Sequence, residues 1–246
     1  MKYVHYSVAA ITIIIALIII FRYRIIYYIS LQSSSCPHVN TLERTCKQIY
    51  VADSDMSAPA NTLRLNLTWE PWMLTYIKQY SNPNGIAIDI GANIGIHSVN
   101  MAPYFKQVIA FEPNPITFRM LQKNTASIKN ITLVPSAAGD YNGITHFSAS
   151  AMNCQSKITD TASATNAVKI VRIDDFIGTT QRVPVSFIKI DVEGYEIQAF
   201  KGMYKIIAAY RPAIVFEDHT GANAQYLKTT HQYVITKINK TNYIAH

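Results

Sequence analysis

Cysteine is scarce in this sequence, and the few cysteines lie at no metal-binding spacing. Cys36, Cys46 and Cys154 form neither a CxxC pair nor a cysteine–histidine pattern of the kind that holds zinc. This absence argues against a structural zinc site. Cys36 and Cys46 would form a disulfide only in an oxidising compartment, and the sequence leaves that question open.

Runs of one charge are absent as well. The formal net charge is +7, but the 22 lysine and arginine residues are spread along the chain without a run of five or more. A scattered basic excess indicates a solvated surface rather than a nucleic-acid arm, so we expect no nucleic-acid partner. An anionic membrane or an acidic glycan would be compatible with the same charge.

A long apolar run lies at the start of the chain. Residues 4–21 consist mainly of Val, Ala, Ile and Leu, and these 18 residues are just enough to cross a bilayer as a helix. A cleaved signal peptide is the competing interpretation, but its apolar stretch is shorter and small residues follow it. We predict a membrane anchor over residues 1–31, with the transmembrane helix at about 4–21. Basic residues on its two sides nearly balance, so the side of the membrane that the domain faces is left open.

One folded domain is expected after this anchor. Residues 32–62 are polar and show no steady apolar period, so they predict a stem or linker. Residues 63–246 are enough for a single hydrophobic core and hence for one active site. Thr68 is predicted as the N-cap of a helix that runs to about Tyr80.

Short apolar runs alternate with helical stretches in this domain. Strands that are apolar on both faces indicate a parallel sheet covered by helices, so the fold class is a doubly wound α/β sheet. Residues 233–238 and 243–246 predict an antiparallel hairpin. The small, polar residues 148–167 predict either a mobile loop over the site or a disordered segment. The predicted strands are 86–90, 108–111, 131–134, 185–190 and 213–216, and the predicted helices are 95–102, 116–128 and 195–209.

The first of these strands ends in a glycine turn that suits a ligand site. Asp89, Gly91, Asn93 and Gly95 lead directly into a helix, and glycines let a backbone approach a ligand closely. The spacing differs from the GxGxxG dinucleotide fingerprint, which disfavours a nicotinamide or flavin enzyme. A turn that serves only packing would have similar residues. The residues that follow the neighbouring strands therefore decide whether this turn belongs to a ligand site.

Acidic residues follow the neighbouring strands. Glu112, with Asn114 after it, ends the second strand, where a carboxylate can accept the hydroxyls of a ribose. Carboxylates that converge at one sheet edge repel one another, which a fold tolerates chiefly where a cation, a base or a hydroxyl-rich ligand uses them. The further residues are Asp191 and Glu193 after the fourth strand, and Glu217 and His219 after the fifth.

Seven motifs occur in order along the chain: IDIGANIGIHS, IAFEPNP, AAGDYNG, VRIDDFI, FIKIDVEGYE, KGM and RPAIVFE. Together they resemble the FkbM family of methyltransferases over about residues 84–246. The resemblance implies a Rossmann-like class I fold with a mostly parallel seven-stranded sheet. It also implies S-adenosylmethionine as cofactor, and O-methylation of a hydroxyl on a glycan, a lipid or a small molecule.

The same resemblance implies roles for single residues. The turn from Gly91 to Gly95 would hold the methionine part of the cofactor, Glu112 the ribose and the backbone near Ala137 the adenine, while Asp191 would lie by the reactive methyl group. The predicted cofactor residues are Asp89, Gly91, Asn93, Gly95, Glu112, Asn114 and Ala137.

An alcohol is a poor nucleophile at neutral pH, so a nearby base is useful. Asp191 is the first candidate, and Glu193, Glu217 and His219 are the others. A divalent metal between Asp191 and Glu217 would be compatible with their oxygens, but two acids do not make a site.

Two other functions are weighed against this one. A nucleic-acid methyltransferase would be expected to carry Asn/Asp-Pro-Pro-Tyr after the fourth strand, where IDVEG stands instead. A membrane-tethered binding module without catalysis would be expected to lack part of the acidic set, whereas Asp89, Glu112 and Asp191 are all present.

Deleting residues 1–31 is expected to release the protein into the soluble fraction, because the apolar helix that would hold it in the bilayer is removed. Fractionation of cells that express the full or the truncated chain measures this. Sedimentation of the truncated chain with membranes at the level of the full chain would contradict the anchor.

Overall fold

The computed structural model describes residues 68–148, 157–159, 166–178 and 183–246, together with Ile49, Pro59 and Thr62. The predicted anchor, all three cysteines and most of the predicted stem lie outside these residues. None of the helices in the described ranges is long and apolar enough to span a membrane.

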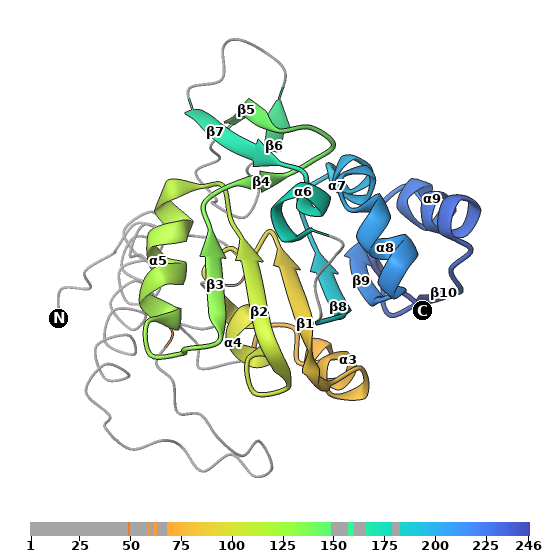
Figure 1. Ribbon diagram of the computed structural model, residues 1–246, viewed down its shortest axis with the longest axis horizontal. Helices are drawn as coiled ribbons and strands as arrows, with labels where there is room; N and C mark the ends of the chain where they lie inside the picture. The colour runs from red at the N-terminus through yellow and green to blue at the C-terminus, as the bar shows by residue number, and fades with distance from the viewer. Residues whose placement is uncertain are drawn as a thin grey trace, which may run out of the picture.

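A seven-stranded sheet forms the centre of the domain, in the order β10-β11-β9-β8-β1-β2-β3 (Figure 1). The strands from β9 to β3 pair in parallel, whereas β10 and β11 are antiparallel. The predicted parallel sheet and its terminal hairpin are therefore confirmed. The strands are β1 (Asn82–Ile90), β2 (Phe105–Phe111), β3 (Ile131–Val134), β8 (Val185–Ile190), β9 (Ala213–Glu217), β10 (Ile235–Lys237) and β11 (Asn242–Ala245).

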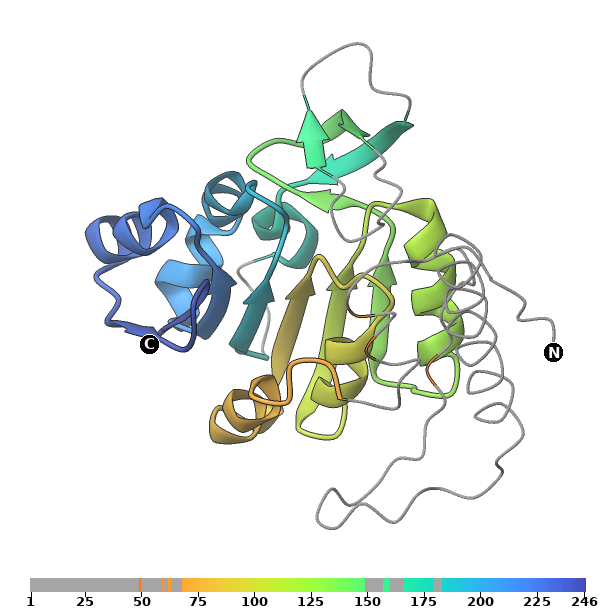
Figure 2. The same ribbon diagram turned by 180° about the vertical axis from the view of Figure 1, so that it is seen from behind.

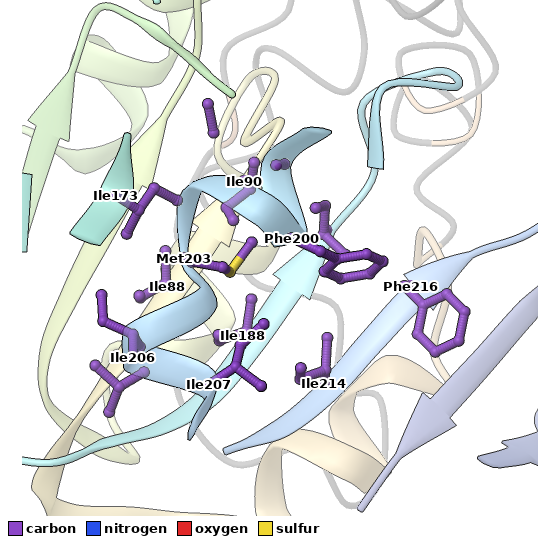
Figure 3. Close-up of a cluster of buried hydrophobic side chains, with 14 of the residues drawn as sticks. Ile88, Ile90, Ile173, Ile188, Phe200, Met203, Ile206, Ile207, Ile214 and Phe216 are labelled. Atoms are coloured by element: carbon purple, nitrogen blue, oxygen red, sulfur yellow. The ribbon is translucent and has the colours of Figure 1, made fainter. Parts of the chain in front are cut away.

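Helices cover both faces of this sheet, as Figures 1 and 2 show from opposite sides. Successive residues of a strand point to opposite faces. Ile88 and Ile90 of β1 therefore pack in one apolar cluster with Phe200 and Ile206 (Figure 3), and Ala87 packs in another with Met73 of the opposite face. One face carries α3 (Met73–Gln79), α4 (Ile96–Met101) and α5 (Pro115–Thr125), and the other carries α6 (Ile173–Ile177), α7 (Glu196–Gly202), α8 (Tyr204–Tyr210) and α9 (Ala222–His231).

A second, four-stranded sheet lies beyond the ends toward which β1, β2 and β3 point (Figures 1 and 2). Its strands, in the order β4-β7-β5-β6, are β4 (Ala137–Ala138), β7 (Asn166–Val171), β5 (Gly143–Ser148) and β6 (Lys157–Thr159). The predicted loop over 148–167 is thus wrong for β6 and for the start of β7. Backbone pairing with β5 orders these small, polar residues, and side-chain periodicity does not reveal such pairing. Residues 149–156 and 160–165 lie outside the described ranges.

The single helix predicted over 195–209 is in fact two helices, α7 and α8, which meet at Met203. Asp174 of α6 caps the start of α8, because its carboxylate accepts the backbone N–H groups of Lys205 at 2.9 Å and of Ile206 at 3.0 Å. Gly202 lies so close to Gly139 that an added Cβ would sit 1.8 Å from the Gly139 carbonyl oxygen. The break between α7 and α8 therefore has two causes, and both are contacts between distant parts of the chain.

Two other differences concern helix starts. Thr68 does not cap α3, which begins at Met73 after a turn in which Glu70 has a positive φ of 43°. Helix α9 is not among the helices predicted from the sequence. Asp218 orders the turn that leads into it by accepting the N–H groups of Thr220, Gly221 and Ala224.

Asp174→Ala is expected to lower the free energy of unfolding by about 1–2 kcal/mol, the usual cost of losing a helix cap. Urea unfolding followed by circular dichroism measures this value. The neighbouring Asp175→Ala is the matched control, because the side chain of Asp175 is 49% exposed and its removal should change stability by less than about 0.5 kcal/mol. Equal losses in the two variants would contradict the capping role.

Candidate active site

A cavity of about 260 Å³ opens at the carboxyl ends of the central strands. The sheet runs from β1 to β2 and β3 on one side and to β8 and β9 on the other, and ligands of open α/β sheets bind where the strand order reverses in this way. Asp89, Gly95 and His219 are not among the residues that line the cavity. The other predicted site residues, Gly91, Asn93, Glu112, Asn114, Ala137, Asp191, Glu193 and Glu217, all line it.

Asp89 lies beneath the glycine turn, where it is fully buried. Its carboxylate accepts the hydroxyl hydrogen of Ser98 on α4 at 2.6 Å, and its other oxygen lies 3.4 Å from the ammonium group of Lys189. Lys189 in turn donates to the carbonyl oxygen of Gly91 at 2.7 Å and lies 3.9 Å from Asp191. Asp89 therefore acts on the cavity through the turn that it supports.

Two opposing effects set the pKa of Lys189. Burial lowers this pKa, but the nearby negative charges of Asp89, Asp191 and Glu70 outweigh burial and hold the pKa above its ordinary value. Lys189 is therefore a fixed cation that neutralises part of the acidic group. It is not a candidate for proton transfer near neutral pH.

The two glycines of the turn serve different purposes. Gly91 has a φ of 73°, and an added Cβ would lie 1.9 Å from the backbone oxygen of Asp191, so the tips of β1 and β8 approach too closely for any side chain. Gly95 has a φ of 92°, and a Cβ there would lie 2.6 Å from Leu121 on α5. Gly91 thus shapes the cavity wall, whereas Gly95 allows α5 to pack.

Glu112 joins the tip of β2 to the same turn. One carboxylate oxygen accepts the N–H of Asn93 at 2.8 Å, and the other accepts the N–H of Asn114 at 2.8 Å and the hydroxyl of Thr117 at 2.9 Å. Burial raises the pKa of Glu112, and these hydrogen bonds oppose the rise. A carboxylate has about four lone-pair positions, so about one is left for a ligand hydroxyl.

The two ends of the Asn114 amide group have different surroundings. Its oxygen caps α5 by accepting the N–H of Ile116 at 2.9 Å. Its amide nitrogen is buried and has no hydrogen-bond partner in the described part of the chain, although Asn114 lines the cavity. A buried donor without a partner costs stability unless a ligand or water accepts from it. Asn114 and Glu112 therefore present one donor and one acceptor to a polar ligand.

A second acidic group lines the cavity near β8 and β9. The side chain of Asp191 is 45% exposed, and that of Glu217 is 22% exposed. Burial raises the pKa of Glu217, and the negative charge of Asp191 raises it further. His219 lies 3.3 Å from Glu217, but its side chain is 64% exposed. Within the described ranges, no group of three or more His, Cys, Asp or Glu residues is arranged to hold a metal ion.

The turn that carries Glu193 has its own fixed geometry. Glu193 has a positive φ of 55°. Glu196, in the first turn of α7, accepts the N–H groups of Val192 and Gly194 with one carboxylate oxygen, at 3.2 and 3.1 Å. The backbone that positions Asp191 and Glu193 is thereby held from within its own loop.

Several residues that line the cavity were not predicted as site residues, among them Glu70, His97 and Phe147. His97 carried a weak signal, because it is a polar residue in the first turn of a helix that follows a ligand-type turn. Glu70 and Phe147 carried none. Their approach to the cavity depends on the path of α3 and on the second sheet.

Three comparisons with known proteins agree with this geometry. A family model described as the methyltransferase FkbM domain matches residues 89–245. The hexuronic acid methyltransferase AglP of Haloferax volcanii is 28% identical over 162 residues, which cover 64% of this chain and 66% of that protein. The crystal structure of methyltransferase FkbM from Methylobacillus flagellatus KT aligns with a TM-score of 0.50 and 18% identity, covering 81% of this chain and 56% of that one. The chain thus spans slightly less than two thirds of the first relative and little more than half of the second.

Lys189→Met is expected to lower the free energy of unfolding by about 3–5 kcal/mol, because it leaves Asp89 buried without its cation. The double variant Asp89→Asn/Lys189→Met should lose less than the sum of the two single variants, by about 0.5–3 kcal/mol. Urea unfolding of the three variants and the parent chain measures this coupling. Strictly additive losses would show that the two groups do not interact.

Proposed function

This chain belongs to the FkbM family of methyltransferases, and on that premise we propose that it methylates a hydroxyl group of a sugar with S-adenosylmethionine as methyl donor. The family match includes every residue of the predicted site. The observation that carries the proposal is the cavity itself, where Gly91, Glu112 and Asp191 line one space at the carboxyl ends of neighbouring strands.

The lining residues suit the cofactor in charge and in hydrogen bonding. Glu112 has a lone pair for a ribose hydroxyl, the amide of Asn114 can donate, and the backbone at Gly91 allows close approach. Ala137, at the start of β4, is the predicted neighbour of the adenine. When bound, S-adenosylmethionine supplies an electrophilic methyl group and a good leaving group.

The residues of the chain have two tasks in this reaction. The first is to hold the acceptor hydroxyl in line with the methyl donor, because alignment alone can lower a barrier by several kcal/mol, up to roughly 7–11 in favourable cases. The second is to accept the hydroxyl proton. We assign this second task to Asp191 and Glu217, since both line the cavity and the negative charge of Asp191 helps to raise the pKa of Glu217. A raised pKa makes Glu217 a stronger base.

A sugar is favoured as the acceptor class by the relative from Haloferax volcanii, whose name gives hexuronic acid as its substrate. A screen of glycans, glycolipids and small alcohols with methyl-labelled cofactor is the direct test. Binding of the cofactor without transfer to any hydroxylated acceptor would favour a binding module instead.

Two substitutions separate cofactor binding from chemistry. Glu112→Ala should weaken the binding of S-adenosylmethionine by about 10-fold to 100-fold, because a charged acceptor is lost and the turn at Asn93 loses its partner. Asp191→Asn keeps the shape of the side chain but removes its charge, so it should lower kcat while changing the Kd of the cofactor less. Calorimetry and initial rates measure the two effects.

The exposed Asp175→Asn is the control for both substitutions, because its side chain is 49% exposed and does not line the cavity. Small and equal effects of Glu112→Ala and Asp191→Asn would refute the proposed assignment. Failure of the parent chain to bind S-adenosylmethionine at millimolar concentration would refute the proposed function as a whole.

A further inference from the structure

A histidine–carboxylate pair in the cavity has no role in the function proposed above. The Nε2 atom of His97, in the first turn of α4, lies 3.0 Å from a carboxylate oxygen of Glu70. His97 is only 6% exposed, yet both residues line the cavity. Glu70 reaches this position through a backbone with a positive φ of 43°, which is uncommon for a non-glycine residue. The uncommon backbone conformation of Glu70 and the burial of His97 indicate that the pair is a built feature of the cavity.

The partner of one ring nitrogen fixes the role of the other. A carboxylate only accepts hydrogen bonds, so Nε2 of His97 carries the hydrogen that Glu70 accepts. In the neutral ring, Nδ1 is then an acceptor. This Nδ1 atom is buried and has no hydrogen-bond partner among the residues that the structure describes. With the ring neutral, Nδ1 is therefore a buried acceptor on a residue of the cavity wall, and no donor within the described ranges satisfies it.

The charges around this acceptor favour a cationic donor. Lys189 lies 3.4 Å from Asp89 and 3.9 Å from Asp191, and the negative charge of Glu70 also acts on it, so three carboxylates share one ammonium group. The group as a whole therefore stabilises added positive charge. His97 also follows the glycine turn by two residues, which places it beside the part of the cavity that we assign to the methionine portion of the cofactor.

We propose that His97, positioned by Glu70, accepts a hydrogen bond from the α-ammonium group of S-adenosylmethionine. The proposal rests on the proposed function, because it takes the cavity to be the cofactor site. His97 is then a cofactor-binding residue, and Glu70 is a positioning residue that fixes the ring tautomer. The pair would thus bind the amino-acid end of the cofactor. Ala137 would contact the adenine, at the other end of the cofactor.

Calorimetry with two ligands tests this contact. The ligands are S-adenosylhomocysteine and its deaminated analogue, which lacks only the α-amino group. The parent chain should bind the deaminated analogue about 10-fold to 100-fold more weakly, since a charge-assisted hydrogen bond is lost. His97→Gln keeps a donor near the position of Nε2 for Glu70 but has no acceptor at the position of Nδ1. This variant should bind S-adenosylhomocysteine about 10-fold more weakly than the parent chain does, and its affinity for the deaminated analogue should be almost unchanged.

Three further variants make the test specific. His97→Asn places an oxygen near the position of Nδ1 and should recover part of the preference for the amine. Glu70→Gln should reduce the preference less than His97→Gln, because only the orientation of the ring is loosened. His231→Gln is the matched control, since His231 is also 6% exposed and its Nε2 atom has no hydrogen-bond partner in the described part of the chain, but it does not line the cavity. It should leave both affinities unchanged.

The outcomes separate this inference from the proposed function. If the parent chain binds both ligands equally, or if His97→Gln weakens both by the same factor, the inference is overturned while the cofactor site stands. If the parent chain binds neither S-adenosylhomocysteine nor 5′-methylthioadenosine, the cavity is not a cofactor site, and the proposed function itself is refuted. If His97→Gln fails to fold, the comparison of the two ligands on the parent chain and on His97→Asn decides the matter.

Discussion

The site depends on the interactions of the ammonium group of Lys189. This group donates to the carbonyl oxygen of Gly91 and lies between Asp89 and Asp191, so a single cation joins the tip of β1 to the tip of β8. A buried carboxylate such as Asp89 is costly unless it is paired. The pairing lets the fold keep an acid beneath the turn, and Ser98 holds the second oxygen of that acid. Glu112 makes the corresponding link between β2 and the turn through the N–H of Asn93. The tips of three strands are thereby fixed around one space.

Much of this arrangement could be predicted from the sequence. The apolar runs of β1, β8 and β9 are short and continuous, as is typical of buried parallel strands, and acids directly after such strands lie at one edge of the sheet. The same edge of the sheet is therefore predicted for Glu112, Asp191 and Glu217, and all three line the cavity. The sequence does not show that Asp89 is covered by the turn, because that depends on how closely the turn approaches β8, where a Cβ added at Gly91 would lie 1.9 Å from the backbone oxygen of Asp191.

The features that the sequence did not reveal share one physical cause. The break between α7 and α8 depends on Asp174, which is about thirty residues away in the chain, and on the backbone of Gly139. Strand β6 is ordered by hydrogen bonds to β5 rather than by an apolar face. Glu70 approaches His97 only because α3 packs beside α4. Periodicity reports which face of an element is buried, and it carries no information about a polar group that finds its partner across the fold.

The four-stranded sheet connects two residues of the cavity wall. Ala137 on β4 and Phe147 on β5 both line the cavity, and both strands are hydrogen-bonded to β7, which lies between them. Because β7 pairs with both strands, a movement of β5 would be transmitted to β4 through the hydrogen bonds of β7. Such coupling is reciprocal by thermodynamic necessity. Two molecules that each move this sheet on binding would therefore change each other's affinity by the same factor.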